Sequence, residues 1–208
     1  MRIAIIGAGN VGQALGRGWA KAGHAIVFGV RSPDPARYPK LASEQLKTPN
    51  GAAADADIIV LATPWDSAQA AIASLGDLGG RILIDCTNPL AMTKSGFGLA
   101  LGFDISGGER VAEWAKGAAV FKTLNQTGAE NIAEATRFAM RPAMFIAGDD
   151  SGKKLIVMQV VRDLGFDAID AGPLANARLL EPLAMVWIDQ ALKRGRGRDF
   201  AFTLIPRG

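Results

Sequence analysis

The sequence has little of the side-chain chemistry on which many enzyme families depend. Its 208 residues include one cysteine, one histidine and one tyrosine. A single cysteine, Cys86, excludes an internal disulfide and fits a reducing compartment. The only histidine, His24, follows a glycine ahead of a predicted strand, and we interpret it as structural. A dehydrogenase with a histidine acid/base is therefore not expected.

Two further catalytic arrangements are missing. No group of cysteine, histidine and carboxylate residues has the spacing of a metal site, so the sequence predicts no metal. The only tyrosine, Tyr38, is followed four positions later by Ala42, which excludes the Tyr-x-x-x-Lys pair of short-chain dehydrogenases. A lone cysteine at a strand end is interpreted as a core residue.

Long apolar runs and a strong charge are also missing. No stretch approaches the ~20 apolar residues of a membrane-spanning helix, and the N-terminus does not have the pattern of a signal peptide. A net charge of +3 is too small to indicate nucleic-acid binding. We expect a soluble cytoplasmic protein with no membrane and no nucleic-acid partner. The basic segment 193–198 is interpreted as a helix end, with an anionic partner as the alternative.

Apolar runs of strand length alternate with helical patterns along a chain that is 49% hydrophobic. The predicted strands are Arg2–Ile6, Ala25–Val30, Ile58–Ala62, Arg81–Asp85, Ala119–Thr123, Ala143–Ala147 and Phe166–Asp170. The predicted helices are Val11–Lys21, Asp34–Lys47, Asp66–Leu75, Glu109–Lys116, Ser151–Leu164 and Asn176–Arg194, with a glycine-rich loop around Ser95–Phe103.

This alternation predicts an α/β fold with a Rossmann-type, doubly wound, mostly parallel sheet covered on both faces. The last helix follows the final strand, so it is expected to form a small C-terminal helical lobe. We predict a Rossmann domain at 1–172 and a helical lobe at 173–208, with a homodimer as the assembly.

A glycine motif follows the first predicted strand and opens the first predicted helix. The segment Gly7-Ala8-Gly9-Asn10-Val11-Gly12 is G-x-G-x-x-G, which gains its meaning from this strand–helix context. Gly7 permits the tight turn, Gly9 lets a pyrophosphate approach the backbone, and Gly12 allows close packing of helix and strand. The motif therefore predicts a dinucleotide at the helix N-terminus.

The end of the second predicted strand favours NADP(H) over NAD. NAD-binding sites usually carry an acidic residue there, which holds the ribose 2′-hydroxyl. In this chain the strand ends in Arg31 and Ser32 instead. Arg31 can bind a 2′-phosphate bidentately and Ser32 can donate to it. Asp34, beyond Pro33, is expected to point away.

Polar and proline-containing loops follow four of the predicted strands. Because ligands lie outside the carboxyl ends of the strands in an open α/β sheet, we expect these loops to share one edge and line the site. The loops are Thr63-Pro64-Trp65, Thr87-Asn88-Pro89-Leu90, Lys122-Thr123-Leu124-Asn125-Gln126-Thr127 and Ala171-Gly172-Pro173-Leu174.

Segments over nearly the whole chain carry a family resemblance. They are the Gly7–Gly12 loop, Phe28–Arg31, Thr63-Pro64-Trp65, Ala147–Asp150 with Lys153 and Lys154, and Asp170–Leu174 with Arg178, Leu179 and Glu181. On these residues the sequence resembles the NADPH:coenzyme F420 oxidoreductases, in which NADPH exchanges a hydride with a 5-deazaflavin. It is also similar to the N-terminal domain of the Steap ferrireductases.

The resemblance implies a role for particular residues. Gly9, Asn10 and Val11 would contact the pyrophosphate, and Arg31 would contact the 2′-phosphate. Thr63, Pro64 and Trp65 would lie along the nicotinamide, with Gly172, Pro173 and Leu174 on the far wall of the site. The deazaflavin would lie near Leu124 and Asn125. The sequence departs from the family at Phe121–Thr127, where the family motif carries a histidine and this chain has none.

Three functions remain open from the sequence. The leading hypothesis is hydride transfer between NADP(H) and a deazaflavin (coenzyme F420) or flavin acceptor, with Asn88 on the cofactor side and Lys122 or Asn125 stabilising charge on the acceptor. The second is an NADP-dependent reductase of a small carbonyl or imine substrate, with Lys122 as proton donor. The third is a non-catalytic NADPH sensor.

Overall fold

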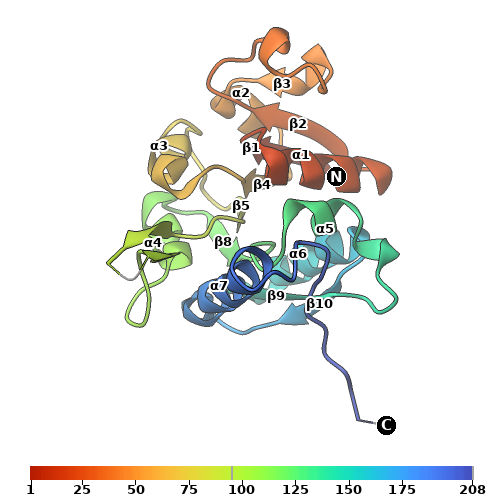
Figure 1. Cartoon of the computed structure of the whole chain (residues 1–208). Coiled ribbons are helices and arrows are strands. Elements are labelled where there is room, and N and C mark those ends of the chain that lie inside the picture. The colour runs from red at the N-terminus through yellow and green to blue at the C-terminus, as the bar shows by residue number, and fades with distance from the viewer. Residues whose placement is uncertain (95, 208) are drawn as a thin grey trace.

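The computed structural model describes residues 1–94 and 96–207, in which the main feature is an eight-stranded sheet (Figure 1). The strand order across the sheet is β10-β9-β8-β5-β4-β1-β2-β3. The strands are β1 (Arg2–Ile6), β2 (Ala25–Gly29), β3 (Leu46–Lys47), β4 (Ile58–Leu61), β5 (Ile82–Asp85), β8 (Ala119–Lys122), β9 (Ala143–Gly148) and β10 (Asp167–Asp170). The α-helices are α1 (Asn10–Lys21), α2 (Pro49–Ala53), α3 (Ala68–Ala73), α4 (Gly107–Trp114), α5 (Ala129–Ala133), α6 (Ser151–Asp163) and α7 (Ala177–Leu192).

The strand directions confirm the predicted fold class. The pairs β1–β2, β2–β3, β1–β4, β4–β5 and β5–β8 are parallel, as are β9 and β10. The single antiparallel pair of this sheet, within the described residues, joins β8 to β9. The chain order reverses between β1 and β4, which is the switch point where ligands bind in this class of fold.

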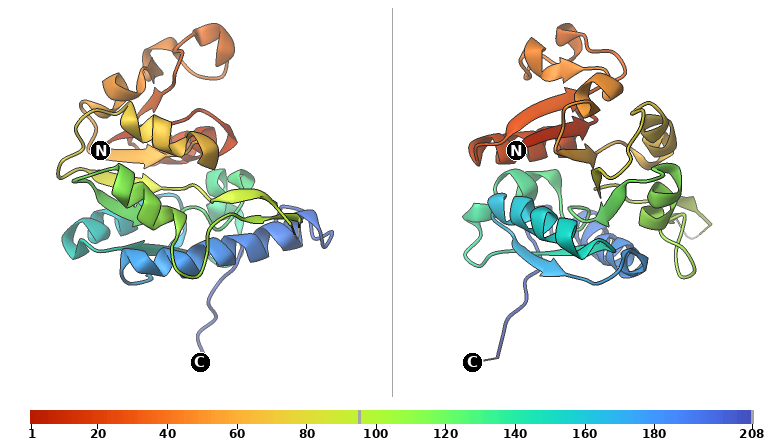
Figure 2. Two further views of the ribbon diagram at one scale, coloured as in Figure 1. Left: turned by 90° about the vertical axis from the view of Figure 1, so that its left-hand side faces the viewer. Right: turned by 180° about the vertical axis from the view of Figure 1, so that it is seen from behind.

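Both faces of the sheet are covered by helices, which explains why its strands are apolar throughout. Ile3 and Ile5 of β1 belong to the cluster packed against α1, α5 and α6, whereas Ala4 and Ile6 belong to the cluster with α2, α3 and α4. Figure 2 shows these helices on the two sides of the sheet. Each buried Ile or Leu side chain contributes about 1.5–3 kcal/mol through the hydrophobic effect.

Two local predictions are wrong. Residues 34–47 do not form a helix but two 3₁₀ turns (Pro35–Arg37 and Ser43–Gln45) and β3. Asp34 accepts a hydrogen bond from Ala36 N and caps only the first turn, and Pro39 has no N–H with which to continue it.

The predicted glycine-rich loop is in part a hairpin. Strands β6 (Leu90–Thr93) and β7 (Gly96–Leu99) pair antiparallel, with Leu90 opposite Leu99. Ser95, where the predicted loop begins, lies outside the described residues. Pro89 O accepts a hydrogen bond from Ala100 N at 2.7 Å and closes the hairpin at its base.

The last helix, α7, begins and ends within two residues of its prediction. After it, Gly195 adopts a positive φ of 71°, and the chain returns without regular structure along β9, where Phe202 O accepts from Ala143 N at 2.8 Å. Figures 1 and 2 show the final residues projecting from the body. None of the helices formed by the described residues is both long and apolar enough to span a membrane.

Candidate functional site

The loop after β1 is shaped by its glycines. Gly7 has a φ of 108°, and its N–H donates to Gly29 O at 2.9 Å. A Cβ on Gly7 would lie 2.6 Å from Ala62 O, and one on Gly12 would lie 2.1 Å from Gly7 O. A Cβ on Gly9, in contrast, would meet no atom within 4 Å. Packing thus requires two of the glycines, while the third leaves the backbone open to a ligand.

The N-terminus of α1 offers uncapped donors beside that open surface. Its N-cap is Gly9, which has no side chain to accept from the first-turn N–H groups, and the first turn carries no acidic residue. Asn10 is exposed and Val11 is half-buried. Free N–H groups and the positive end of the helix dipole make this end suited to a pyrophosphate.

The loop after β2 presents positive charge to solvent at the same edge. Arg31 and Ser32 are exposed, and Arg31 makes no ion pair with any residue that the structure describes. The carboxylate of Asp34 is engaged with Ala36 N at 2.9 Å. Arg31 is therefore available to a 2′-phosphate, and Asp34 is bound within its own turn, as expected.

The loop after β4 contributes a hydroxyl and an indole ring. Thr63 Oγ1 is buried and has no hydrogen-bond partner in the described part of the chain. Trp65 packs against Trp114 with ring centroids 5.3 Å apart and an interplanar angle of 35°. A buried hydroxyl without a partner next to the glycine loop is a donor that a bound nicotinamide carboxamide can satisfy.

The loops after β5 and β8 are joined by a pair of amides. Asn125 Nδ2 donates to Asn88 Oδ1 at 3.0 Å, and Asn88 Nδ2 donates to the carbonyl of Asn125 at 2.9 Å. Asn125 Nδ2 also lies 3.3 Å from the carbonyl of Leu180 on α7. The structure thus brings two of the predicted site residues into direct contact.

The predicted residue Lys122 is enclosed at the end of β8. It is 0% exposed, and its ammonium donates to Asp85 Oδ2 at 2.9 Å, to Glu181 Oε1 at 2.9 Å and to Thr87 O at 2.5 Å. These contacts use all three donors of a lysine. Burial alone lowers the pKa of Lys122, but the charges of Asp85 and Glu181 outweigh it and raise that pKa above its ordinary value. A fully paired, strongly basic ammonium does not suit a proton donor.

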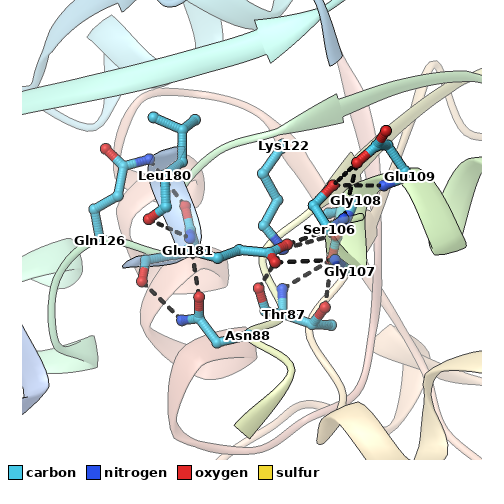
Figure 3. Close-up of polar contacts among 12 residues, drawn as sticks. Thr87, Asn88, Ser106, Gly107, Gly108, Glu109, Lys122, Gln126, Leu180 and Glu181 are labelled. Atoms are coloured by element: carbon cyan, nitrogen blue, oxygen red, sulfur yellow. Dashed lines mark hydrogen bonds and ion pairs between the residues drawn. The ribbon is translucent and has the colours of Figure 1, made fainter. Parts of the chain in front are cut away.

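The carboxylate of Glu181 joins three parts of the site. It is 1% exposed and accepts from Gly107 N at 2.9 Å and Gly108 N at 3.0 Å, at the N-terminus of α4, besides pairing with Lys122. Figure 3 shows this carboxylate between Lys122 and the start of α4. The helix dipole and the ammonium both compensate its charge.

Sequence reasoning gave no role to Asp85 or Glu181. Each carried a recognisable signal, because Asp85 ends an otherwise apolar strand and Glu181 lies among the apolar residues Leu180 and Ala184 on the buried side of α7. Charged residues at such positions are rarely buried unless they are paired.

Leu124, between Thr123 and Asn125, has a φ of 59°, in the left-handed region that leucine seldom adopts. Its side chain is 1% exposed, and the neighbouring Thr123 Oγ1 is buried without a partner in the described chain. Strained backbone of this kind gathers at functional sites. The turn after β8 is therefore the most unusual backbone at this edge.

The fourth predicted loop follows a strand of the opposite direction. Because β9 runs antiparallel to β8, and β10 parallel to β9, Gly172–Leu174 does not leave the sheet in the direction of the other three loops. The register still places it near the end of β8, because Gly148 pairs with Phe121 and its N–H donates to Gly172 O at 3.0 Å. Gly172 O also accepts from Lys154 Nζ at 2.8 Å.

The remaining reactive side chains belong to the framework. Burial raises the pKa of the Cys86 thiol, so it stays protonated within the core. His24 Nε2 lies 2.9 Å from Asp163 Oδ2, on α6. The described residues contain no cluster of histidine, cysteine and carboxylate groups that could hold a metal ion.

Comparison with known proteins places this arrangement in context. The family described as "NADP oxidoreductase coenzyme F420-dependent" matches residues 2–89. The F420-dependent NADP reductase of Methanothermobacter thermautotrophicus is 27% identical, over 99% of this chain and 96% of that protein. A putative F420-dependent NADP reductase from Arthrobacter sp. FB24, known from a crystal structure, is 30% identical in sequence. Its structure superimposes with a TM-score of 0.88, and the match covers 98% of this chain and 99% of that one.

A mammalian protein is similar over part of its length. The metalloreductase STEAP3 of Rattus norvegicus is 27% identical over 88% of this chain. The chain spans 36% of the length of that protein.

Proposed function

The chain belongs to the family of coenzyme F420-dependent NADP oxidoreductases, and from this premise we propose that it transfers a hydride directly between NADP(H) and a deazaflavin of the coenzyme F420 type. The chain is an NADP-dependent oxidoreductase; the identity of its acceptor is the proposal. One observation carries it. The edge formed by β4, β5 and β8 offers amides, hydroxyls and an aromatic ring, while the ammonium of Lys122 there is buried and fully paired.

The residues at the carboxyl ends of β1 and β2 fit NADP(H). The open backbone at Gly9 and the uncapped start of α1 would hold the pyrophosphate, with Gly7, Asn10, Val11 and Gly12 shaping the loop. Arg31 and Ser32 would bind the 2′-phosphate, which separates NADP(H) from NAD(H) by charge.

The nicotinamide is assigned to the loops that follow β4 and β5. Thr63 Oγ1, which has no protein partner, would bind the carboxamide, and Pro64 and Trp65 would limit the ring on one side. Asn88, held by Asn125, would limit it on the other. NADPH supplies a hydride, and the oxidised deazaflavin accepts it together with one proton from solvent.

The acceptor ring is assigned to the turn after β8. Asn125 would donate to a ring oxygen or nitrogen, where charge develops during transfer, by exchanging its 3.3 Å bond to the Leu180 carbonyl for one to the ring. Lys122 would not touch the acceptor, because its ammonium is buried and paired, and its charge would act only through its neighbours. Gly172, Pro173 and Leu174 would form the far wall of the site, because Gly172 O accepts from Gly148 N and Gly148 pairs with Phe121, next to Lys122.

The buried state of Lys122 also bears on the alternative of a carbonyl or imine reductase. That alternative needs a proton donor in contact with the substrate, and Lys122 was its candidate. With Lys122 enclosed between Asp85 and Glu181, its ammonium does not reach a substrate, and this alternative loses its candidate donor.

Finer features of the predicted protein remain proposals. We propose a homodimer that covers the exposed apolar residues of α7, among them Leu179 and Val186. The division into 1–172 and 173–208 and the cytoplasmic location stay predictions.

The test mixes the full chain with NADPH and either the deazaflavin or FMN and follows the ring absorbance in a stopped-flow instrument. We expect a first-order phase with the deazaflavin and a slower one with FMN. Lack of NADPH oxidation with either ring would contradict the proposal. NADPH oxidation is measured in parallel with a panel of ketones and imines. Oxidation with one of these and with neither ring would favour the carbonyl or imine alternative.

A further inference from the structure

Helix α7 reaches the end of β8 through two consecutive residues. The carboxylate of Glu181 pairs with Lys122 Nζ at 2.9 Å, and the carbonyl of Leu180 lies 3.3 Å from Asn125 Nδ2. Lys122 is the last residue of β8, and Asn125 is three positions further on. One short stretch of α7 thus holds both ends of the turn that follows β8.

The backbone between these two anchors is strained. Leu124 has a φ of 59°, in the left-handed region that a non-glycine residue keeps only where the surrounding structure imposes it. Thr123 N also donates to Asp85 O at 3.2 Å, at the upper end of the range for such a bond. The turn therefore depends on contacts from outside itself.

The other partners of the Glu181 carboxylate are backbone N–H groups at the start of a helix. Its two oxygens accept from Gly107 N and Gly108 N, the first N–H groups of α4. A side chain would not fit at Gly107, since its Cβ would lie 3.0 Å from Glu181 Oε1 and 3.1 Å from Trp65. The start of α4 fixes the carboxylate, and the carboxylate fixes the ammonium.

We propose that Glu181 is a positioning residue that holds the strained turn Thr123–Asn125 through Lys122. The proposal rests on the function given above, in which that turn faces the acceptor ring. Glu181 does not touch either ring. Its effect is to keep Asn125 and the backbone of Leu124 at a fixed distance from the nicotinamide loops.

The chain offers a matched control on the same helix. Arg178 lies one turn before Glu181 and also ties α7 to the first turn of α4, through bonds of 2.6 and 2.9 Å to Glu109. In the part of the chain that the structure describes, its hydrogen bonds and ion pair go to Glu109 and not to β8. Arg178→Gln therefore loosens α7 from α4 without releasing Lys122, whereas Glu181→Gln removes the charge that pairs with Lys122.

The first measurement needs no cofactor or acceptor. Hydrogen–deuterium exchange of the peptide 119–127 in the free protein should be about tenfold faster in Glu181→Gln than in the wild type, as expected when a charged hydrogen bond is lost. In Arg178→Gln the same peptide should exchange at the wild-type rate. Equal exchange in both variants, fast or slow, would overturn the proposal.

The second measurement uses the complete system. Glu181→Gln should leave the Kd for NADPH within about twofold of the wild type, because the hydrogen bonds and ion pairs of Glu181 in the described chain go to α4 and Lys122 and not to the glycine loop or Arg31. It should lower kcat for the acceptor about tenfold. Arg178→Gln should keep both constants. A change confined to NADPH binding would also overturn the proposal.

Glu181→Asp covers the case in which the glutamine variant does not fold. It keeps the negative charge at α4 and shortens the side chain by one methylene, which weakens the contact with Lys122. Faster exchange of 119–127 is again expected, and wild-type exchange overturns the proposal. If no ring oxidises NADPH in the wild type, the proposed function fails while the exchange result still decides the role of Glu181.

Discussion

Lys122 and Glu181 form an ion pair of 2.9 Å with side chains that are 0% and 1% exposed, although one residue ends a strand and the other lies inside the last helix. Asp85 makes the second ion pair of Lys122, so the ammonium lies between two carboxylates. Removing one member of such a buried group leaves an uncompensated charge, which costs far more than the pair contributes. The first prediction follows from this asymmetry.

Replacing Lys122 should lower the stability of the folded protein. In Lys122→Met, Asp85 and Glu181 remain buried without their cation, and we expect the free energy of unfolding to fall by about 3–5 kcal/mol. Urea denaturation followed by circular dichroism measures this. A variant with wild-type stability and no turnover would instead support Lys122 as a proton donor.

Two glycines of the first loop should respond in opposite ways to alanine. Gly9→Ala places its Cβ in open space, so stability should stay unchanged while NADPH binding weakens by about 10–100-fold through lost phosphate hydrogen bonds. Gly12→Ala places its Cβ 2.1 Å from Gly7 O, so the free energy of unfolding should fall by about 1–3 kcal/mol. Thermal melts and fluorescence titration with NADPH distinguish the two. Equal loss of stability in both variants would mean that Gly9 is buried by packing rather than reserved for a ligand.

The cofactor preference should depend on Arg31. Arg31→Ala should weaken NADPH binding by about 10–100-fold, the value of a charge-assisted hydrogen bond, and leave NADH binding unchanged. Arg37→Ala is the control, since Arg37 is exposed in the following 3₁₀ turn. Titration of each variant with both nucleotides gives the ratio of the two Kd values. A parallel loss for NADPH and NADH would remove Arg31 from the 2′-phosphate site.

The tie between α4 and α7 should fail in acid. Hydrogen bonding from Arg178 lowers the pKa of Glu109 from 4.5 to about 2. The folded-state pKa is depressed, so the stabilisation is fully present above about pH 4.5 and is lost as the pH falls toward 2. Comparing the wild type with Arg178→Gln by denaturation across this window should show a difference that is constant above pH 5 and shrinks below it. A difference that grows on acidification would contradict this assignment.

The signals for the NADP half of the site are local in the sequence. Gly7, Gly9 and Gly12 lie within six residues of one another, and Arg31 follows directly on a strand. The direction of β9 was not predictable in this way. It is set by contacts such as that of Gln126, whose side-chain amide bonds to both the N–H and the carbonyl of Phe145, each at 3.0 Å.

The signals for the acceptor half are local only in part. Lys122 and Asn125 were recognised by their place after a strand, but their partners come from residues far along the chain. Glu181 and Leu180 are more than fifty positions away, and only the fold brings them near. Pairing across such distances leaves no periodic pattern in the sequence.

The reversed strands β9 and β10 carry the chain to the far edge of the sheet, and α7 brings it back across the start of α4. Buried contacts therefore cross the predicted boundary at Gly172, among them the ion pair of Lys122 with Glu181. A fragment ending at Gly172 would keep every glycine of the phosphate loop. It would leave Lys122 with one carboxylate, Asp85, in place of two, and the first amides of α4 without their acceptor.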